Sequence, residues 1–207
     1  MEGEAVVWVV AGDSKARRAL AARLKLLGLG WTVCRSADEF FEVSAPGRPG
    51  CVLLDVSRPE ADLELLERRG ARGQHRPVVG ISGSADVPTA VRAMKLGAFD
   101  FLDQSCTNRQ LAETIAEAIA HDAENRREIG QAETSRRRLS RLDDGLRQVL
   151  DLLLAGCTNR EMAVELDLSI RAIEERRAKV MRTMRAKSLP DLVRQTLVAE
   201  GTRLRAE

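Results

Sequence analysis

The first 120 residues alternate short apolar runs with segments of helical periodicity, and this alternation constrains the fold more than any other feature. The apolar runs at residues 5–10, 31–34, 51–55, 77–82 and 99–103 predict strands, and the segments at 14–27, 37–43, 62–69, 87–96 and 107–121 predict helices. Runs such as VVWVV are continuously apolar, as strands are when both faces of a parallel sheet are covered. Because parallel strands need helical crossovers, the pattern predicts a doubly wound α/β domain, a five-stranded parallel sheet with helices on both faces. In such a sheet, functional groups gather at the carboxyl ends of the strands.

The rest of the chain has a different character. Residues 122–141 lose the apolar periodicity and become highly charged, which predicts a linker that is helical, disordered or partly each. Beyond it, the periodicity predicts four short helices at 143–155, 158–167, 169–184 and 189–200, followed by a frayed tail. We therefore expect an α/β domain at residues 1–121, a partly helical linker at 122–141 and a small all-α four-helix domain at 142–207.

The composition argues against several classes of protein. No apolar run approaches the ~20 residues that a membrane-spanning helix needs, and the N-terminus carries acids where a secretory signal carries Lys or Arg. We therefore expect a cytoplasmic protein with no membrane partner. The absence of CxxC or Cys/His spacing argues against a zinc site or a disulfide framework, so we expect no bound metal from the four cysteines, Cys34, Cys51, Cys106 and Cys157. The absence of GxGxxG and P-loop motifs argues against an independent enzyme.

Basic residues are concentrated in one predicted helix. The formal net charge is only +2, but residues 171–187 contain seven basic side chains against two acidic ones. A dense basic helix in a nearly neutral protein is typical of a nucleic-acid contact, although a solvated helix face has the same pattern.

Several motifs of the α/β domain resemble a two-component receiver domain. They are the strand that ends in LLD at Asp55, Ser82-Gly83 after the fourth predicted strand, and GAFDFLD at 97–103. The stretch ADVPTAVRAMKLGAFDFL at 85–102 is similar to receivers of the FixJ group. The resemblance covers residues 5–120 and implies that Asp55 is the candidate acceptor of a phosphoryl group.

The sequence departs from the receiver pattern where charge is needed. A carboxylate that attacks a phosphoryl group needs a divalent cation and a lysine ammonium to neutralise the developing charge. The family holds magnesium on two adjacent acids after the first strand, but these positions match Ala11 and Gly12, and only the next residue, Asp13, is acidic. The family's lysine after the fifth strand matches Gln104, and the proline after it matches Ser105.

Asp55, the hydroxyl of Ser82 and the aromatic ring of Phe101 remain from the receiver pattern. We predict that magnesium binding is weak or absent and that no other cofactor is bound. Asp55 is then a strand-end carboxylate without chemistry, a residue phosphorylated with Asp13 or a hydrated metal as a substitute, or part of a different ligand or partner surface. Ser82 and Phe101 either pack the strand ends or take part in a switch.

Residues 142–197 resemble the LuxR/FixJ-type helix-turn-helix over their whole length. The resemblance rests on AG-x-TNREMA-x-x-L-x-x-S-x-x-x-I-E at 155–174 and on RAKSLPDLV at 185–193. The residues also support helices independently, because Gly156 can end one helix and Thr158 with Glu161 can form a capping box. Ser169 is a suitable N-cap for the next helix.

The helix at 169–184 has two different faces. Ile173, Val180 and Met184 recur at helical spacing and predict the core stripe. The opposite face, which we expect to enter the major groove and meet base edges, carries Arg171, Glu174, Glu175, Ala178 and Arg182. The candidates for phosphate contacts are Arg176 and Lys179 beside that face and Thr158, Asn159 and Arg160 at the start of the supporting helix.

Two details of this helix remain open or depart from the family. Glu174 and Glu175 either accept hydrogen bonds from cytosine N4 or favour the positive end of the helix dipole. The threonine and histidine usual in the family are replaced by Ala172 and Arg176, which removes one phosphate hydrogen bond and adds a permanent charge.

These features predict a DNA-binding transcriptional regulator of the response-regulator type whose receiver is independent of the ordinary magnesium-dependent phosphorylation cycle. We expect double-stranded DNA as its partner, a homodimer at least on DNA, and a histidine kinase or other protein as a further partner. One alternative is a working response regulator that accepts phosphate on Asp55. The other is an interaction protein that acts through the receiver face at 87–96 and 99–103.

Overall fold

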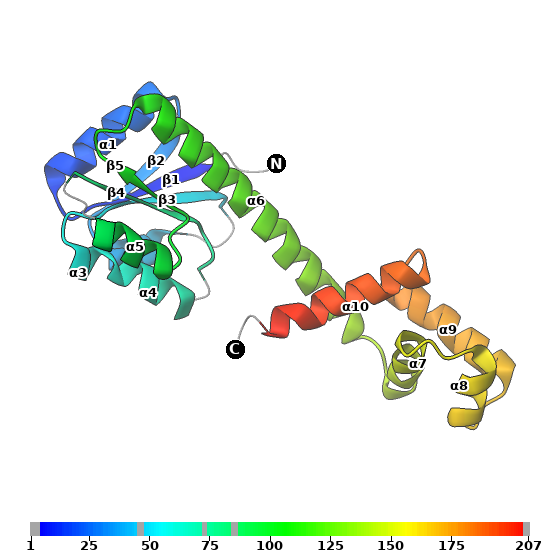
Figure 1. Cartoon of the computed structure of the whole chain (residues 1–207). Helices are drawn as coiled ribbons and strands as arrows, with labels where there is room; N and C mark the ends of the chain where they lie inside the picture. Colours follow the sequence, from blue (N-terminus) through cyan, green and yellow to red (C-terminus); the bar gives the residue numbers. More distant parts are fainter. Residues whose placement is uncertain (1–4, 45–47, 72–73, 84–86, 205–207) are drawn as a thin grey trace. The chain divides into compact units, whose positions relative to one another are not determined.

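The structure is a computed structural model that describes residues 5–44, 48–71, 74–83 and 87–204. The chain divides into two compact units, Met1–Arg126 and Arg127–Glu207 (Figure 1). Among the described residues, no helix is both long and apolar enough to cross a membrane.

A five-stranded parallel sheet forms the centre of the N-terminal unit, in the order β2-β1-β3-β4-β5. Its strands are β1 (Val6–Val10), β2 (Gly30–Cys34), β3 (Gly50–Asp55), β4 (Val78–Ser82) and β5 (Asp100–Asp103). Val10 at the end of β1 pairs with Cys34 on one side and Leu54 on the other. The strand order therefore reverses between β1 and β3, which is where a doubly wound sheet places its site. The predicted fold class is confirmed.

Helices cover both faces of this sheet. They are α1 (Ser14–Leu26), α2 (Ala37–Val43), α3 (Pro59–Asp62), α4 (Glu64–Ala71), α5 (Val87–Lys95) and α6 (Asn108–Leu139). Alternate residues of each strand point to opposite faces, so Val7 and Val9 pack with α1 and α6, whereas Trp8 and Val10 pack with α2, α4 and α5 (Figure 1). The short helix α3 is not predicted by the periodicity; Pro59 begins it, because its fixed φ suits a first helical turn.

The charged segment at 122–141 is helical as far as Leu139, as part of α6. In the C-terminal unit, Ala132 and Ser135 are buried. Arg138 Nη1 donates hydrogen bonds of 3.0 Å to the Met184 carbonyl and to Gln195 Oε1. The last turns of α6 therefore pack against the helices that follow, which the charged sequence of this segment does not predict.

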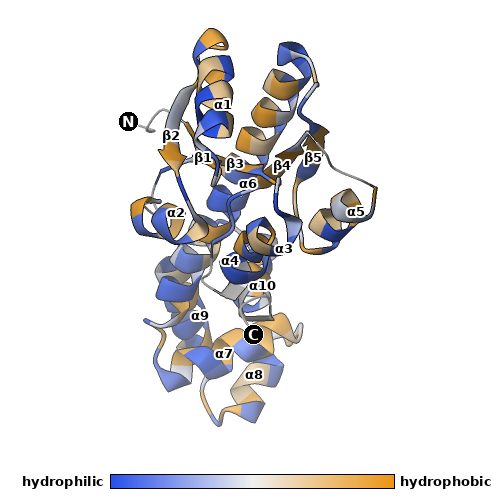
Figure 2. Ribbon diagram, turned by 90° about the vertical axis from the view of Figure 1, so that its left-hand side faces the viewer, coloured by the Kyte–Doolittle hydropathy of each residue, from blue (hydrophilic) through white to orange (hydrophobic). Residues whose placement is uncertain are grey.

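The C-terminal unit contains the four predicted helices, α7 (Asp144–Leu154), α8 (Asn159–Glu165), α9 (Ile170–Met184) and α10 (Leu189–Leu204). Its core contains Leu146, Val149, Met162, Ile173 and Val180. Figure 2 shows that most of the α9 ribbon has the colour of hydrophilic residues. The prediction that the chain frays after residue 200 is wrong for Gly201–Leu204, which continue α10; residues 205–207 lie outside the described residues.

Candidate functional site

Asp55 is the last residue of β3, and it is only 5% exposed. Ser57 Oγ donates a hydrogen bond of 2.9 Å to Asp55 Oδ2. Burial raises the pKa of the Asp55 carboxyl, and the nearby carboxylates of Asp62 and Asp13 raise it further, while the Ser57 hydrogen bond and Arg58 oppose the shift. The environment of Asp55 therefore disfavours its negative charge.

The Arg58 guanidinium lies beside Gly12, the second of the two positions that follow β1. Ala11 is buried at 2% exposure, and a Cβ atom built on Gly12 would lie 2.5 Å from Arg58 Nη2. Asp62 holds Arg58 in place, because its carboxylate accepts from the Arg58 backbone N–H at 2.6 Å and from Nη2 at 3.2 Å. Arg17 Nη1 donates to the carbonyls of Ala11 and Gly12 at 2.7 and 2.8 Å. The guanidinium groups of Arg58 and Arg17 thus lie at this loop, together with the carboxylates of Asp13 and Asp62.

Asp13 is an exposed N-cap of α1, and its Oδ2 accepts a hydrogen bond of 2.7 Å from the Ala16 N–H. This bond satisfies one of the free N–H groups of the first helical turn and so gives Asp13 a structural role. Within the described ranges, no group of three or more His, Cys, Asp or Glu side chains is arranged to hold a metal ion.

The loop between β5 and α6 carries the two other departures from the receiver pattern. A Cβ atom on Gly83 would collide with Gln104 Oε1, so the Gln104 side chain lies over the end of β4. Ser105 donates to Asp103 Oδ1 from its backbone N–H at 2.7 Å and from its hydroxyl at 2.5 Å. An amide and a hydroxyl therefore occupy the two positions that the resemblance to receivers matches to a lysine and a proline.

Arg23 on α1 fixes the same loop, and sequence reasoning missed it. Its Nε donates to Asn108 Oδ1 at 2.9 Å, its Nη2 to the Cys106 carbonyl at 2.6 Å and its Nη1 to the Gln104 carbonyl at 3.2 Å. These bonds join residues 81 to 85 positions apart along the chain, so no local sequence signal could reveal them.

Ser82 and Phe101 occupy the positions that the sequence predicts, at the end of β4 and within β5. Ser82 is 1% exposed. Phe101 is half-buried, and its ring lies against Gly80, since a Cβ atom there would be 2.5 Å from Phe101 Cδ2. The structure thus gathers Asp55, Ser82, Gly12 and Gln104 at the carboxyl edge of the sheet.

The raised pKa of Asp55 predicts a pH-dependent effect of Asp55→Asn on stability. When the pKa of a carboxyl is higher in the folded state than in the unfolded state, protonation of that carboxyl favours folding. Once the carboxyl is ionised in both the folded and the unfolded state, it opposes folding. We therefore expect Asp55→Asn to unfold with a higher free energy than the wild type at neutral pH. The difference should shrink as the pH falls toward the unfolded-state value of about 3.9. Urea unfolding of both proteins over a pH series measures it, and a wild type that is more stable at neutral pH would contradict the prediction.

The C-terminal unit contains the predicted helix caps. Thr158 and Glu161 form a capping box, with the Thr158 N–H donating to Glu161 Oε2 at 2.6 Å and the Glu161 N–H donating to Thr158 Oγ1 at 3.3 Å. Ser169 Oγ accepts from the Ala172 N–H at 3.1 Å. Arg177 Nη1 donates to Asn159 Oδ1 at 2.9 Å, so α8 and α9 are held together by a side chain that sequence reasoning did not single out.

The two faces of α9 differ as the periodicity predicts. Ile173, Val180 and Met184 are completely buried. All of the residues predicted to face bases are exposed: Arg171, Glu174, Glu175, Ala178 and Arg182. Of the predicted phosphate contacts, Thr158, Arg160 and Lys179 are exposed and Asn159 and Arg176 are partly buried.

Two of these side chains have ionic partners. Arg171 Nε lies 3.5 Å from Glu175 Oε1, and Lys179 Nζ lies 3.7 Å from Asp143 Oδ2. Because all four side chains are well exposed, both pairs are weak and can exchange for a contact with a ligand. The exposed face of α9 thus offers a mixed surface of acids and bases.

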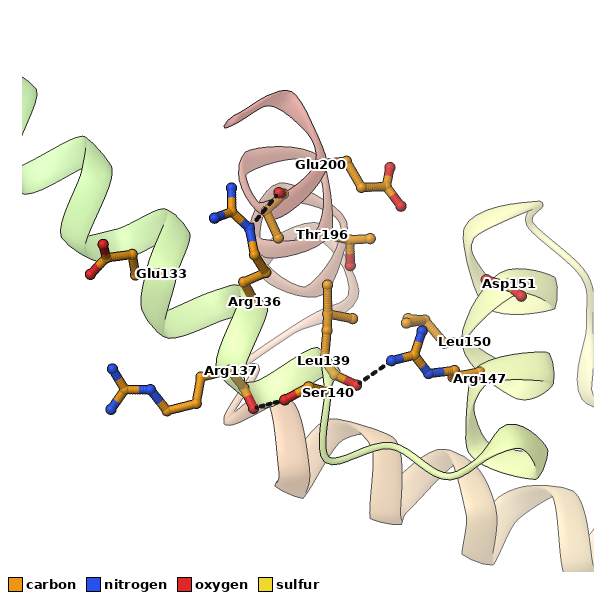
Figure 3. A pocket seen from close by; sticks show the side chains of 11 residues that line it. Glu133, Arg136, Arg137, Leu139, Ser140, Arg147, Leu150, Asp151, Thr196 and Glu200 are labelled. Carbon is orange, nitrogen blue, oxygen red and sulfur yellow. Dashed lines mark hydrogen bonds between the residues drawn. The ribbon is translucent and has the colours of Figure 1, made fainter. Parts of the chain in front are cut away.

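A groove of about 700 Å³ lies elsewhere in the C-terminal unit, between the end of α6, α7 and α10 (Figure 3). Arg136 Nε donates to the Ala199 carbonyl at 3.4 Å, and Arg147 Nη2 donates to the Leu139 carbonyl at 3.2 Å. These bonds bridge the three helices that line the groove. Arginines and carboxylates line it in equal number, namely Arg136, Arg137, Arg147, Glu133, Asp151 and Glu200.

Comparison with known families accounts for both units. Residues 7–116 match the response regulator receiver domain, and residues 147–196 match the bacterial regulatory proteins of the luxR family. The transcriptional regulatory protein FixJ of Azorhizobium caulinodans is 38% identical over 194 residues, which cover 93% of this chain and 92% of that protein. FixJ of Rhizobium meliloti is 36% identical, over 92% of this chain and 94% of its own length.

Solved structures give the same result. The response regulator StyR has a TM-score of 0.80 with 29% sequence identity, and the match covers 94% of this chain and 98% of StyR. Full-length FixJ from B. japonicum has a TM-score of 0.55 with 36% identity, over 95% of this chain and 98% of FixJ. The chain therefore belongs to the FixJ-type response regulators, transcription regulators that join a receiver domain to a LuxR-type DNA-binding domain.

Proposed function

We propose that this regulator binds double-stranded DNA through α9 and that its receiver does not follow the ordinary magnesium-dependent phosphorylation cycle. The observation that carries the second part is the Arg58 guanidinium beside Gly12, on the side of the site where receivers hold magnesium. Asp62 pairs with this guanidinium at 3.2 Å, and one oxygen of Asp13 caps α1. No magnesium or other cofactor is required in this proposal.

The chemistry of the site supports the same conclusion. A phosphoryl group on Asp55 would carry about −2 charge in place of the single charge of the carboxylate, which needs cations close to the new oxygens. The Gln104 amide has no net charge, and Ala11 and Gly12 have no side-chain oxygen to hold a metal. In this proposal the receiver keeps the fold of its family, and it is either constitutive or set by protein level, a ligand or a protein partner.

Magnesium titration with a phosphodonor assay tests this proposal. We expect no saturable change in the NMR shifts of Asp13 and Asp55 at millimolar magnesium, and no phosphoryl adduct by intact mass after incubation with acetyl phosphate and magnesium. Asp55→Asn should bind selected operators within tenfold of wild-type affinity.

The matched control is the triple variant Ala11→Asp, Gly12→Asp, Gln104→Lys, which restores the acids and the ammonium. It should bind magnesium, because a side chain at Gly12 displaces only the far end of the flexible Arg58 side chain. A wild-type adduct that Asp55→Asn abolishes would instead establish the phospho-accepting alternative.

We further propose that two copies bind one operator. A single recognition helix reads few base pairs, and helix-turn-helix proteins commonly place two copies about 34 Å apart. Exposed apolar residues on α5 and α10 are the candidate contacts, with Val87 at 76% and Leu197 at 62% exposure. Sedimentation on a selected operator should give a two-to-one complex that Val87→Glu or Leu197→Glu weakens. A one-to-one complex on every selected operator would contradict this prediction.

A further inference from the structure

Ile170, the first residue of α9, is an exposed apolar side chain at the end of the helix proposed to read DNA. It is 44% exposed, whereas Ile173 and Val180 on the same helix are fully buried. Among the described residues, it is therefore not one of the buried or half-buried apolar side chains that form the core of the C-terminal unit. Packing therefore does not explain a large apolar residue at this position.

The local backbone fixes the direction of this side chain. The Ser169 side chain caps α9 through the Ala172 N–H, so the helix begins sharply at Ile170. A β-branched residue has few χ1 rotamers, so its methyl groups are held in nearly constant positions. In helix-turn-helix proteins, the N-terminal residues of the recognition helix contact base edges.

Ile170 begins a row along the exposed side of α9. Glu174 and Ala178 follow it at i+4 and i+8, and both are exposed. The row therefore presents an aliphatic group, a carboxylate and a methyl group in sequence. In the major groove, the thymine C5 methyl is the apolar feature of the base edges, and cytosine N4 is a donor that a carboxylate accepts.

We propose that Ile170 is a specificity-determining residue that contacts the C5 methyl group of a thymine next to the base read by Glu174. This inference rests on the proposed function, because it requires α9 to lie in the major groove. Purines present the N7 acceptor at that place, which Ile170 would bury without a hydrogen-bond partner, and cytosine presents only a C5 hydrogen, which lacks the methyl contact. Ile170 therefore favours thymine both by contact with the methyl group and by exclusion of polar edges.

Thymine-to-deoxyuridine replacement tests the contact, because deoxyuridine lacks only the C5 methyl group. The full chain first selects an operator from a random duplex library, and each thymine of that operator is then replaced in turn. Wild-type protein should lose about fourfold in affinity at one position, as expected for one buried methyl group. Ile170→Ala should show no loss at that position, because the contact is already gone, and Ile170→Val should keep most of the wild-type response.

Val164→Ala is the matched control. Val164 is also an exposed apolar residue of the C-terminal unit, at 84% exposure, but it lies near the end of α8. This variant should keep the wild-type response to deoxyuridine at every position.

Two results would overturn the inference. The first is an identical deoxyuridine profile for wild type and Ile170→Ala. The second is an equal loss of affinity by Ile170→Ala for all duplexes, which would make Ile170 a purely structural residue. A different result would show that the proposed function itself is wrong. If α9 does not lie in the major groove, substitutions of Glu174 and Lys179 would affect neither base discrimination nor salt dependence.

Discussion

Replacement of Asp122 by alanine is expected to lower the free energy of unfolding of the N-terminal unit by about 3 kcal/mol, the lower end of the range for breaking a buried ion pair, because its partner Arg126 is partly exposed. Asp122 lies on α6 and is 2% exposed. Its Oδ2 accepts from the Gly50 N–H at 2.9 Å and from Arg126 Nε at 2.6 Å. The carboxylate therefore ties α6 to the first residue of β3 and neutralises a cation at the same time.

Removal of this carboxylate takes a negative charge away from two neighbouring arginines, Arg126 and Arg76. Arg76 is 3% exposed, and its guanidinium lies 4.3 Å from the centre of the Trp8 ring. Burial and the neighbouring Arg126 lower the pKa of Arg76 to about 10, and Asp122 acts in the opposite direction. Without Asp122, Arg76 and Arg126 repel each other, and the Gly50 N–H loses its acceptor.

Urea unfolding followed by tryptophan fluorescence measures this effect. Both tryptophans, Trp8 and Trp31, lie in the N-terminal unit, and the chain contains no tyrosine, so the signal reports on that unit alone. Glu124→Ala is the control, because Glu124 is an exposed acid on the same helix and a surface change of this kind shifts stability by about 0.5 kcal/mol or less. A change below about 1 kcal/mol for Asp122→Ala would contradict the assigned role.

The sequence predicts most of the fold because the signals for it are local. Continuous apolar runs mark the strands, and caps such as Ser169 mark the helix starts. The charged end of α6 is harder to predict, since the buried residues there, Ala132 and Ser135, are small or polar, and Leu139 alone does not give an apolar periodicity. Its Ala, Glu and Arg residues nevertheless favour a helix once tertiary contacts hold its ends.

The candidate site is only partly predictable, because local signals place some of its residues and long-range contacts place the others. Asp55 can be placed at a strand end from the sequence alone, as can the loss of acids at Ala11 and Gly12. The position of the Arg58 guanidinium beside Gly12 cannot be predicted from the sequence, because this position depends on how the loop after β3 approaches the loop after β1. Asp122 is predicted as part of a charged linker, and its burial depends on a partner 72 residues away.

The exposed acid Glu174 is expected to determine base preference, and Lys179 to determine salt dependence. Glu174→Ala should reduce discrimination at one base position by about 1–3 kcal/mol and leave the salt slope unchanged, because it removes a base contact and no phosphate contact. Lys179→Ala should weaken binding to all sequences and reduce the slope of log K against log salt by about 0.9, the loss of one phosphate contact. The exposed pair of Lys179 with Asp143 is too weak to prevent that contact.

Glu175→Ala provides the matched control for Glu174→Ala. Both residues are exposed acids in the first half of α9, and both favour the positive end of the helix dipole, but Glu175 already lies 3.5 Å from Arg171. If Glu174 and Glu175 act only through the helix dipole, the two substitutions should have equal and small effects on base discrimination. If Glu174 accepts from cytosine N4, only Glu174→Ala should relax discrimination, and only at the position of that cytosine. Binding of wild type and the three variants to single-base operator variants over a salt series separates these outcomes, and a loss of discrimination confined to Glu175→Ala would reverse the assignment.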